Sequence, residues 1–380
     1  MRAGVPRLGA VTTTDHPAPD GLELRPLTIP TAIDAPDAGD FAEMVRVRNE
    51  VYRLVSGHDD HAITAAELLP YYAPGAHEKR LTWIAVLDGA VVGRLGLDLP
   101  HEGGGAVGLV QIELHPEVWG RGIGGAAMAL IERTAREHGR TTLQCWAEHH
   151  EVTGGGGDRL APPTGFGSVP ADAHNTRFLL AHGFALEQVE RASVLDLTDP
   201  ATTARIEALL ADARTHAAEY DVVSWQAPTP PEHVAGYAWL KSRMATDVPA
   251  AAMETPEEVW DAARVAEHDT RYTAAGRTLQ VVAARHTATG ELCAFTELVG
   301  NQDRTTATHQ EDTLVLREHR GHRLGALVKG EAILRWRGVA PTSPRVMTWN
   351  AEENRPMLAI NEAMGFVPLV SEGAWQKRLA

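Results

Sequence analysis

The order of apolar and polar positions repeats once along the chain. An apolar run that suits a buried strand leads into a short turn, and a helix follows with apolar residues at helical spacing, such as Met128 and Ile131. A second strand comes next, and a last helix ends at a Gly-Phe pair, glycine being the usual residue just past a helix. We therefore predict two copies of one strand–turn–helix–strand–helix unit. Its first three regular elements are predicted at 107–114, 126–138 and 141–147, and again at 313–316, 326–336 and 345–349.

A β-hairpin is predicted ahead of each copy. Asp88 and Gly89 form a strong two-residue turn signal between two apolar runs, and Thr289 and Gly290 hold the corresponding place in the second half. The hairpin strands are predicted at 83–87 and 91–99 and at 279–286 and 292–298, with helices at 41–56 and 232–244 before them.

The boundary between the two halves is predicted near residue 200. A strand over 192–197 ends at the Thr-Asp-Pro sequence of 198–200, which combines a breaker with an N-cap, and a helix over 204–217 follows. We therefore predict an N-terminal domain over 22–199 and a C-terminal domain over 200–380, sizes that are usual for single domains.

The first copy is the longer one because of an extra loop ahead of its last helix. That loop contains four consecutive glycines at 154–157 and a Gly-Phe-Gly sequence at 165–167. Loops of this length are usually functional or mobile. It is therefore either a flap over a substrate or a solvated insertion.

Composition excludes several classes of protein. The chain has 50 Asp and Glu against 35 Lys and Arg, a net charge of −15, which disfavours nucleic acid and anionic membrane surfaces as partners. No apolar run is long enough to cross a membrane. Cys145 and Cys293 lie far apart, so neither a disulfide framework nor a cysteine zinc site is expected. Because residues 1–21 resemble a disordered leader rather than a secretory signal, we predict a cytoplasmic protein.

The turn before the first helix of each copy is the main candidate for a binding site. Backbone N–H groups of a glycine-rich turn converge on one spot, where the helix dipole adds positive potential, so the turn suits a phosphate group. The residues of the two turns are Gly120, Arg121, Gly122, Ile123, Gly124 and Gly125, and Arg320, Gly321, His322, Arg323, Leu324, Gly325 and Ala326. The first turn also fits the G-x-G-x-x-G dinucleotide fingerprint. The second lacks it, so an NAD-dependent oxidoreductase is the weaker alternative.

Both turns resemble the coenzyme A loop of the GNAT superfamily of acyl-CoA-dependent N-acyltransferases, [Gln/Arg]-x-x-Gly-x-[Gly/Ala]. The corresponding residues are Trp119, Gly122 and Gly124 in the first copy and Arg320, Arg323 and Gly325 in the second. The closing helix of that family runs from an asparagine to Gly-Phe, and the second copy has it between Asn354 and Phe366.

The resemblance implies an α/β fold of two tandem GNAT-like domains, each a mixed, mostly antiparallel twisted sheet flanked by helices. In that family the fourth and fifth strands diverge to admit the coenzyme. The expected donor is acetyl-CoA, with its pyrophosphate on the two turns, its thioester carbonyl near the backbone N–H of Leu114 or Val315, and a contact from Asn354. The expected reaction is transfer of the acetyl group to a primary amine of a small molecule by direct attack.

The candidate bases lie in the second copy. The base of the family often lies near the start of the fourth strand, where this chain has His309 and Glu311, and Glu297 on the neighbouring strand is a third candidate. The tyrosine that commonly serves as general acid is replaced by Leu179 and Asn361. We therefore expect the C-terminal domain to be catalytic and the N-terminal domain to bind coenzyme or to be structural.

Other functions and partners remain open at this stage. Because both copies lack that tyrosine, a non-catalytic protein that binds or senses acyl-CoA is the alternative. The sequence Glu148-His149-His150 lacks the spacing of a metal site and is interpreted as a loop, so no metal is expected. The predicted partner is a small-molecule amine acceptor, with no nucleic acid and no membrane, and the chain is expected to be a monomer or a homodimer.

Overall fold

The two halves of the chain contain similar series of strands and helices. The computed structural model describes residues 17–149 and 157–380. Up to residue 199 its elements are β1 (Leu22–Pro26), α1 (Gly39–Ser56), α2 (Ala65–Leu68), η1 (Leu69–Tyr72), β2 (Glu78–Leu87), β3 (Ala90–Pro100), η2 (Glu102–Gly105), β4 (Val107–Leu114), η3 (Pro116–Val118), α3 (Ile123–Glu137), β5 (Thr142–His149), β6 (Arg159–Leu160), β7 (Val169–Pro170), α4 (His174–Ala181) and β8 (Ala185–Asp196). From residue 200 they are α5 (Pro200–His216), β9 (Tyr220–Gln226), α6 (Pro231–Asp247), α7 (Ala262–Ala274), β10 (Thr278–His286), β11 (Leu292–Gly300), β12 (Thr308–Val315), η4 (Arg317–His319), α8 (Leu324–Val339), β13 (Arg345–Ala351), α9 (Arg355–Met364) and β14 (Val367–Arg378).

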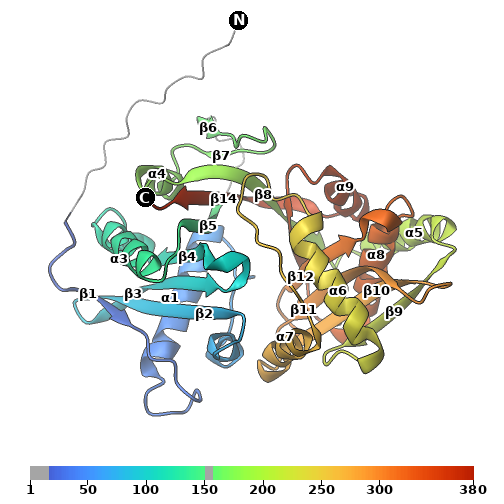
Figure 1. Ribbon diagram of the computed structural model, residues 1–380, viewed down its shortest axis with the longest axis horizontal. Coiled ribbons are helices and arrows are strands. Elements are labelled where there is room, and N and C mark those ends of the chain that lie inside the picture. Colours follow the sequence, from blue (N-terminus) through green and yellow to red (C-terminus); the bar gives the residue numbers. More distant parts are fainter. Residues whose placement is uncertain (1–16, 150–156) are drawn as a thin grey trace, which may run out of the picture.

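Twelve of these strands form one sheet that runs through both halves. Their order is β1-β2-β3-β4-β5-β14-β8-β13-β12-β11-β10-β9, and β6 and β7 form a separate ribbon. The pairing is antiparallel except between β4 and β5 and between β12 and β13. Helices pack against the sheet in both halves (Figure 1). The predicted mixed, mostly antiparallel sheet flanked by helices is confirmed.

The last strand of each half pairs with the other half. β14, at the end of the chain, lies between β5 and β8, and β8 in turn pairs with β13. Trp375 of β14 is fully buried in the hydrophobic core that β2 to β5 build with α3. The two halves are therefore joined by continuous backbone hydrogen bonding and by a shared core.

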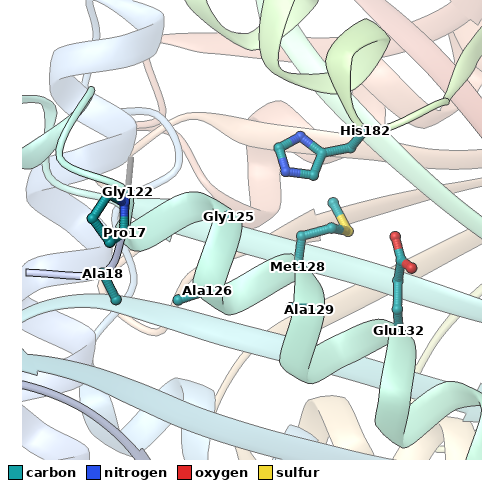
Figure 2. A pocket seen from close by; sticks show the side chains of 9 residues that line it. All are labelled: Pro17, Ala18, Gly122, Gly125, Ala126, Met128, Ala129, Glu132 and His182. Carbon is teal, nitrogen blue, oxygen red and sulfur yellow. The ribbon is translucent and has the colours of Figure 1, made fainter. Parts of the chain in front are cut away.

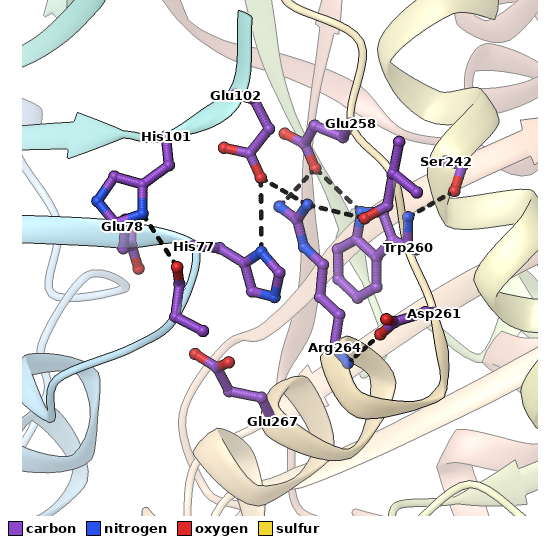
Figure 3. A network of polar contacts seen from close by, with 12 residues as sticks. His77, Glu78, His101, Glu102, Ser242, Glu258, Trp260, Asp261, Arg264 and Glu267 are labelled. Carbon is purple, nitrogen blue, oxygen red and sulfur yellow. Dashed lines mark hydrogen bonds and ion pairs between the residues drawn. The ribbon is translucent and has the colours of Figure 1, made fainter. Parts of the chain in front are cut away.

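A polar network also connects the halves, away from the shared strands (Figure 3). The Arg264 guanidinium of α7 donates to Glu102 of η2 at 2.6 Å and to Glu258 at 3.0 Å, and it lies 4.7 Å from the ring centroid of Trp260. His77 contributes to the same network, 3.8 Å from Glu102. Because Arg264 is largely buried and bonded to two carboxylates, this network restrains how the halves sit against each other.

Several sequence-based expectations differ in detail from the structure. The helix predicted over 204–217 begins at Pro200, because Asp199 caps the N–H of Ala201. Helix α7 was not predicted. Most of the expected leader and most of the four-glycine run lie outside the described residues, and the domain boundary near residue 200 stays a prediction. No helix within 17–149 and 157–380 combines the length and apolar character that crossing a membrane requires.

Candidate active site

A cavity opens in the N-terminal half where β4 and β5 separate. These parallel strands pair only between 107–109 and 142–144. Beyond that point their facing edges diverge, and a cavity of about 690 Å³ lies between them, lined by the end of β4, the glycine turn, α4 and the end of β5. This volume is usual for a small-molecule site. The parallel pairing of β12 with β13 is equally short, at 308–310 and 346–348.

The glycine turn presents free backbone donors to this cavity. Gly120 and Gly122 have φ of 73° and 82°, a left-handed conformation that glycine adopts without strain. Gly122 is the N-cap of α3, and no side chain caps the helix there. The first N–H groups of α3 therefore remain available to an anion, which the helix dipole attracts.

A second hollow of about 610 Å³ continues along the outer face of α3 (Figure 2). Gly122, Gly125, Met128 and His182 line both this hollow and the main cavity. Figure 2 shows the Met128 side chain on the side of α3 that faces His182. The two spaces thus meet at the turn and form one route from the diverging strands to the outside of α3.

The first position of the loop motif holds the turn against the end of its strand in both halves. The Trp119 indole N–H donates to the Leu114 carbonyl at 2.9 Å, and its ring stacks on His174 with centroids 4.3 Å apart. The Arg320 guanidinium makes the same type of bond to the Val315 carbonyl at 3.3 Å. Trp119 therefore holds the first turn in place as Arg320 holds the second, but it carries no positive charge.

A histidine and a carboxylate face each other at the far end of the cavity. His61 follows α1, Glu148 lies near the end of β5, and the His61 Nε2 is 3.0 Å from the Glu148 carboxylate. Burial favours the neutral form of Glu148, but hydrogen bonds from His61 and Trp349 outweigh it, so the pKa of this carboxyl lies below its usual value. The interpretation of Glu148 as a loop residue was wrong, since it belongs to β5. His61 was missed because it lies 87 residues away in sequence.

Glu113, on β4 ahead of the first turn, is fully engaged by its neighbours. It accepts two hydrogen bonds from Arg94 and one from the Tyr52 hydroxyl at 2.9 Å. Burial favours its neutral form, but Arg94 outweighs that effect and lowers the pKa of Glu113. A carboxylate held in this way anchors α1 and β3 to β4 and is a poor proton acceptor.

Two of the three predicted bases of the C-terminal half are already bonded, Glu297 as a buried side chain and His309 as a half-buried one. Glu297 accepts hydrogen bonds from the Tyr237 hydroxyl and from Lys241 at 3.1 Å, and Lys241 also bonds to Asp312 at 2.6 Å. His309 has its Nε2 3.0 Å from the Asp60 carbonyl, and burial lowers its pKa to about 3. His309 is therefore neutral at pH 7 and is held by the N-terminal half.

Glu311, the third predicted base, lies on β12 with an exposed side chain. The surrounding protein disfavours its charged form more than Arg277 favours it, so the pKa of Glu311 is raised. Lys241, Glu297 and Asp312 also act on its charge, so the structure brings Glu311 and Glu297 into one charged cluster. None of the three predicted bases lines the 690 Å³ cavity, and their catalytic role stays a prediction.

Helix α5 covers the second turn at positions where the first is open. Gly122, Ala129 and His182 line the outer hollow of the N-terminal half. The motif alignment equates these residues with Arg323, Gly330 and Met364, and α5 contacts each of the three. Asp212 pairs with Arg323, Leu210 packs on Gly330 without leaving room for a Cβ, and Arg205 reaches the Met364 carbonyl. In the C-terminal half, α5 therefore fills the space that corresponds to the outer hollow of the N-terminal half.

The second turn differs in its backbone as well. Arg323 has a φ of 56°, so a side chain occupies the left-handed position that glycine holds in the first turn. Helix α8 begins earlier than the predicted residue 326: Gly321 and His322 precede it, and Leu324, Gly325 and Ala326 already form its first turn. Asn354 precedes α9 as its N-cap residue, but its side chain caps nothing.

Lys329 of α8 is fully buried in the C-terminal half, at the position that Met128 holds in α3. Within the described part of the chain its ammonium group has no hydrogen-bond partner, and it lies 5.6 Å from the Phe366 ring centroid. Burial lowers the pKa of Lys329 from 10.5 to about 7. Lys329 is tolerated at this buried position because its side chain can lose its proton and become a neutral amine.

We predict that Lys329→Met stabilises the protein and changes how its stability depends on pH. Between pH 7 and 10.5 the unfolded chain keeps a proton on Lys329 that the folded chain has lost, so stability falls as pH falls through this range. The free energy of unfolding at pH 7 should rise by up to about 4 kcal/mol. Urea unfolding at pH 7 and pH 10 measures both effects, with exposed Lys79→Met as the control. A pH dependence of stability that is unchanged in Lys329→Met would show that Lys329 is not a buried lysine with a lowered pKa.

One group of side chains in the C-terminal half has the composition of a metal site. Donor atoms of Glu291, Cys293 and His319 lie within 4.8 Å of one another. The Cys293 thiol donates to the Glu291 carbonyl, and burial raises its pKa to about 11. The thiol is therefore held in its protonated form, which does not bind metal well.

Comparisons with known proteins agree with this geometry. A model of the acetyltransferase (GNAT) family matches residues 45–152, which include the first turn. No curated protein sequence matches the chain. A solved tandem GNAT protein from the clavulanic acid biosynthesis pathway is 25% identical, with a TM-score of 0.71 over 94% of this chain and 98% of that one.

Two further solved structures share the fold at lower identity. A GCN5-related N-acetyltransferase from Sphaerobacter thermophilus is 13% identical, with a TM-score of 0.59 over 95% of this chain and 97% of that one. A GCN5-related glucosamine N-acetyltransferase region of a fungal multi-domain GH3 β-N-acetylglucosaminidase is also 13% identical, with a TM-score of 0.58 over 95% of this chain and 38% of that one.

The family match and the arrangement of strands, turns and cavity place this protein in the class of GNAT-fold proteins. Residues 45–152 match the GNAT family, and the whole chain has the tandem GNAT fold, with two GNAT-like units in one polypeptide. The predicted family resemblance is thereby confirmed. These matches support an acyl-CoA-dependent acetyltransferase activity in general terms.

Proposed function

We propose that the protein transfers an acetyl group from acetyl-CoA to a primary amine of a small molecule, and that the reaction takes place in the N-terminal half. The observation that carries this proposal is the cavity that joins the free backbone donors of the glycine turn to the His61–Glu148 pair. The corresponding place in the C-terminal half is covered by α5. We therefore assign the reaction to the opposite half from the one that the sequence favoured.

The residues of the N-terminal half fit acetyl-CoA. Backbone N–H groups from Gly120 to Gly125 would hold the pyrophosphate, with the N-terminus of α3 behind them. The outer hollow along α3 would take the nucleotide end, and the gap beyond Leu114 would take the pantetheine arm. Bound in this way, the coenzyme supplies an activated thioester carbonyl.

The His61–Glu148 pair is suited to remove a proton from the acceptor amine. An aliphatic amine is protonated at neutral pH and attacks only after losing a proton. Glu148 remains ionised despite its burial, because His61 and Trp349 bond to it. The amide side chain of Asn175 in α4 donates to the Glu148 backbone carbonyl at 2.8 Å, which fixes the strand end relative to α4. A proton can thus pass from the amine to the pair at one defined place.

A comparison of two Glu→Gln variants tests this proposal. Thiol release from acetyl-CoA, measured with a panel of amines, should fall about 10²–10⁴-fold in Glu148→Gln. Calorimetry should show unchanged acetyl-CoA affinity, since Glu148 lies away from the turn. Glu311→Gln is the control from the C-terminal half and should retain full turnover. Loss of turnover in Glu311→Gln with normal turnover in Glu148→Gln would instead return the reaction to the C-terminal half.

A further inference from the structure

Three carboxylates lie side by side across the strands that join the two halves. Glu372 of β14 is the direct cross-strand partner of Glu148 on β5 and of Glu190 on β8. Like charges at directly opposite positions destabilise a sheet. A row of this kind is therefore costly in the free protein.

No lysine or arginine of the described chain pairs with Glu372 or Glu190, whereas Glu148 has His61 beside it. Within the described ranges Glu372 has neither a hydrogen bond nor an ion pair, although it lies deep on the wall of the cavity. The Oε2 of nearby Glu353 is buried and likewise unpartnered in that part of the chain. Arg191, next to Glu190 on β8, points to the other face of the sheet and bonds to Glu352 and Glu362.

Burial and mutual repulsion both act on these acids. Burial, with the charges of Glu190 and Glu148 added to it, raises the pKa of Glu372 well above its usual range. Burial also raises the pKa of Glu190, although the Trp146 indole donates to it at 3.1 Å. A bound cation would allow both groups to ionise, so the cavity favours positively charged ligands.

Aromatic rings border the same end of the cavity. Trp146 and Trp349 both line it, and Trp146 is 43% exposed, which is unusual for so large an apolar side chain. The face of a tryptophan ring attracts an ammonium group, most strongly where water is excluded. Carboxylates and indole rings together form a site for an organic cation rather than for a neutral or acidic molecule.

We propose that the acceptor is a diamine or longer polyamine that binds with one amino group at the His61–Glu148 pair and another at Glu372 and Glu190. This inference rests on the proposed function, because it places the acceptor beside the acetyl donor in the N-terminal half. Adjacent strands are about 4.8 Å apart. Two amino groups roughly 5–10 Å apart therefore match the row, a separation that a chain of four or more methylenes provides.

The test compares three acceptors of similar length, namely 1,4-diaminobutane, n-butylamine and 4-aminobutyrate. With the full-length protein and acetyl-CoA, kcat/KM for the diamine should exceed that for butylamine at least 100-fold, and the amino acid should be the poorest acceptor. In Glu372→Gln and Glu190→Gln the preference for the diamine should fall at least tenfold. Glu187→Gln, at the bulge of β8 and outside the cavity lining, is the control and should keep the full preference.

Calorimetry of 1,4-diaminobutane with the coenzyme-free protein gives a second measurement that needs no turnover. Binding should be detectable and at least tenfold weaker in Glu372→Gln. Equal use of diamine and monoamine, or unchanged diamine binding in Glu372→Gln, would overturn the inference while leaving the acetyltransferase proposal intact. Absence of acetyl-CoA binding, with diamine binding retained, would overturn the proposed function instead.

Discussion

Removing residues 367–380 is expected to unfold both halves of the protein, not only the half to which these residues belong in sequence. They form β14, which fills the middle of the sheet between β5 and β8. The deletion would expose two strand edges and remove Trp375 from the core of the N-terminal half. Loss of one buried tryptophan alone costs about 3–5 kcal/mol, and a whole central strand exceeds the 5–15 kcal/mol that typically stabilises a protein.

Circular dichroism and limited proteolysis of the truncated chain measure this effect. The expected result is loss of cooperative unfolding and proteolysis in both halves. Trp375→Ala is the milder variant and should lower the free energy of unfolding by about 3–5 kcal/mol. Val367→Ser, at the exposed start of the same strand, is the control and should change stability by about 0.5 kcal/mol or less. A truncated chain with a folded, protease-resistant N-terminal half would refute the shared-core interpretation.

The sequence was sufficient to predict the two-copy organisation because the signals that carry it are local. Turn residues such as Asp88 and Gly89, apolar strands and glycine-terminated helices recur in the same order, and each can be recognised within a short window. The exchange of β8 and β14 between the halves could not be predicted in this way. Both halves offer equivalent partners, so no local pattern says with which half a strand pairs.

The site could be predicted only in part for the same reason. The glycine turn was found because its residues are contiguous. The choice between the halves depends on α5, whose residues Leu210 and Asp212 reach the second turn across more than a hundred positions of sequence. The groups at the His61–Glu148 end of the cavity and in the carboxylate row come from the segment after α1 and from β5, β8, β13 and β14. The carboxylate row exists only because β14 pairs with β5 and β8, and that pairing could not be predicted from the sequence.

The two halves also show how one loop can keep its shape while its chemistry changes. Trp119 and Arg320 both fasten the turn to the preceding strand through a single N–H donor. At the next motif position Gly122 leaves the helix N-terminus bare, whereas Arg323 turns toward Asp212. Retaining the first interaction preserves the backbone of the turn. The second position is open at Gly122 in the first turn and occupied by the Arg323–Asp212 pair in the second.

Gly122→Asp is expected to weaken acetyl-CoA binding strongly while the chain stays folded. The new carboxylate would lie at the N-cap of α3, where an aspartate stabilises the helix but occupies the place of an anion. The left-handed φ of 82° costs about 1 kcal/mol for a residue other than glycine, which partly offsets that gain. Loss of charge-assisted bonds to the pyrophosphate should weaken affinity about 100-fold or more.

Isothermal titration with acetyl-CoA measures this effect, and the second turn supplies a matched control. Arg323→Gly introduces the family glycine at the corresponding position and relieves the left-handed strain there. It should leave acetyl-CoA affinity unchanged, because α5 still fills the space beside α8 and the end of α9 through Leu210 and Arg205. The reverse pattern, in which Arg323→Gly alters binding and Gly122→Asp does not, would place the coenzyme in the C-terminal half. Since both variants change only one position of equivalent loops, the comparison separates the two halves without altering their fold.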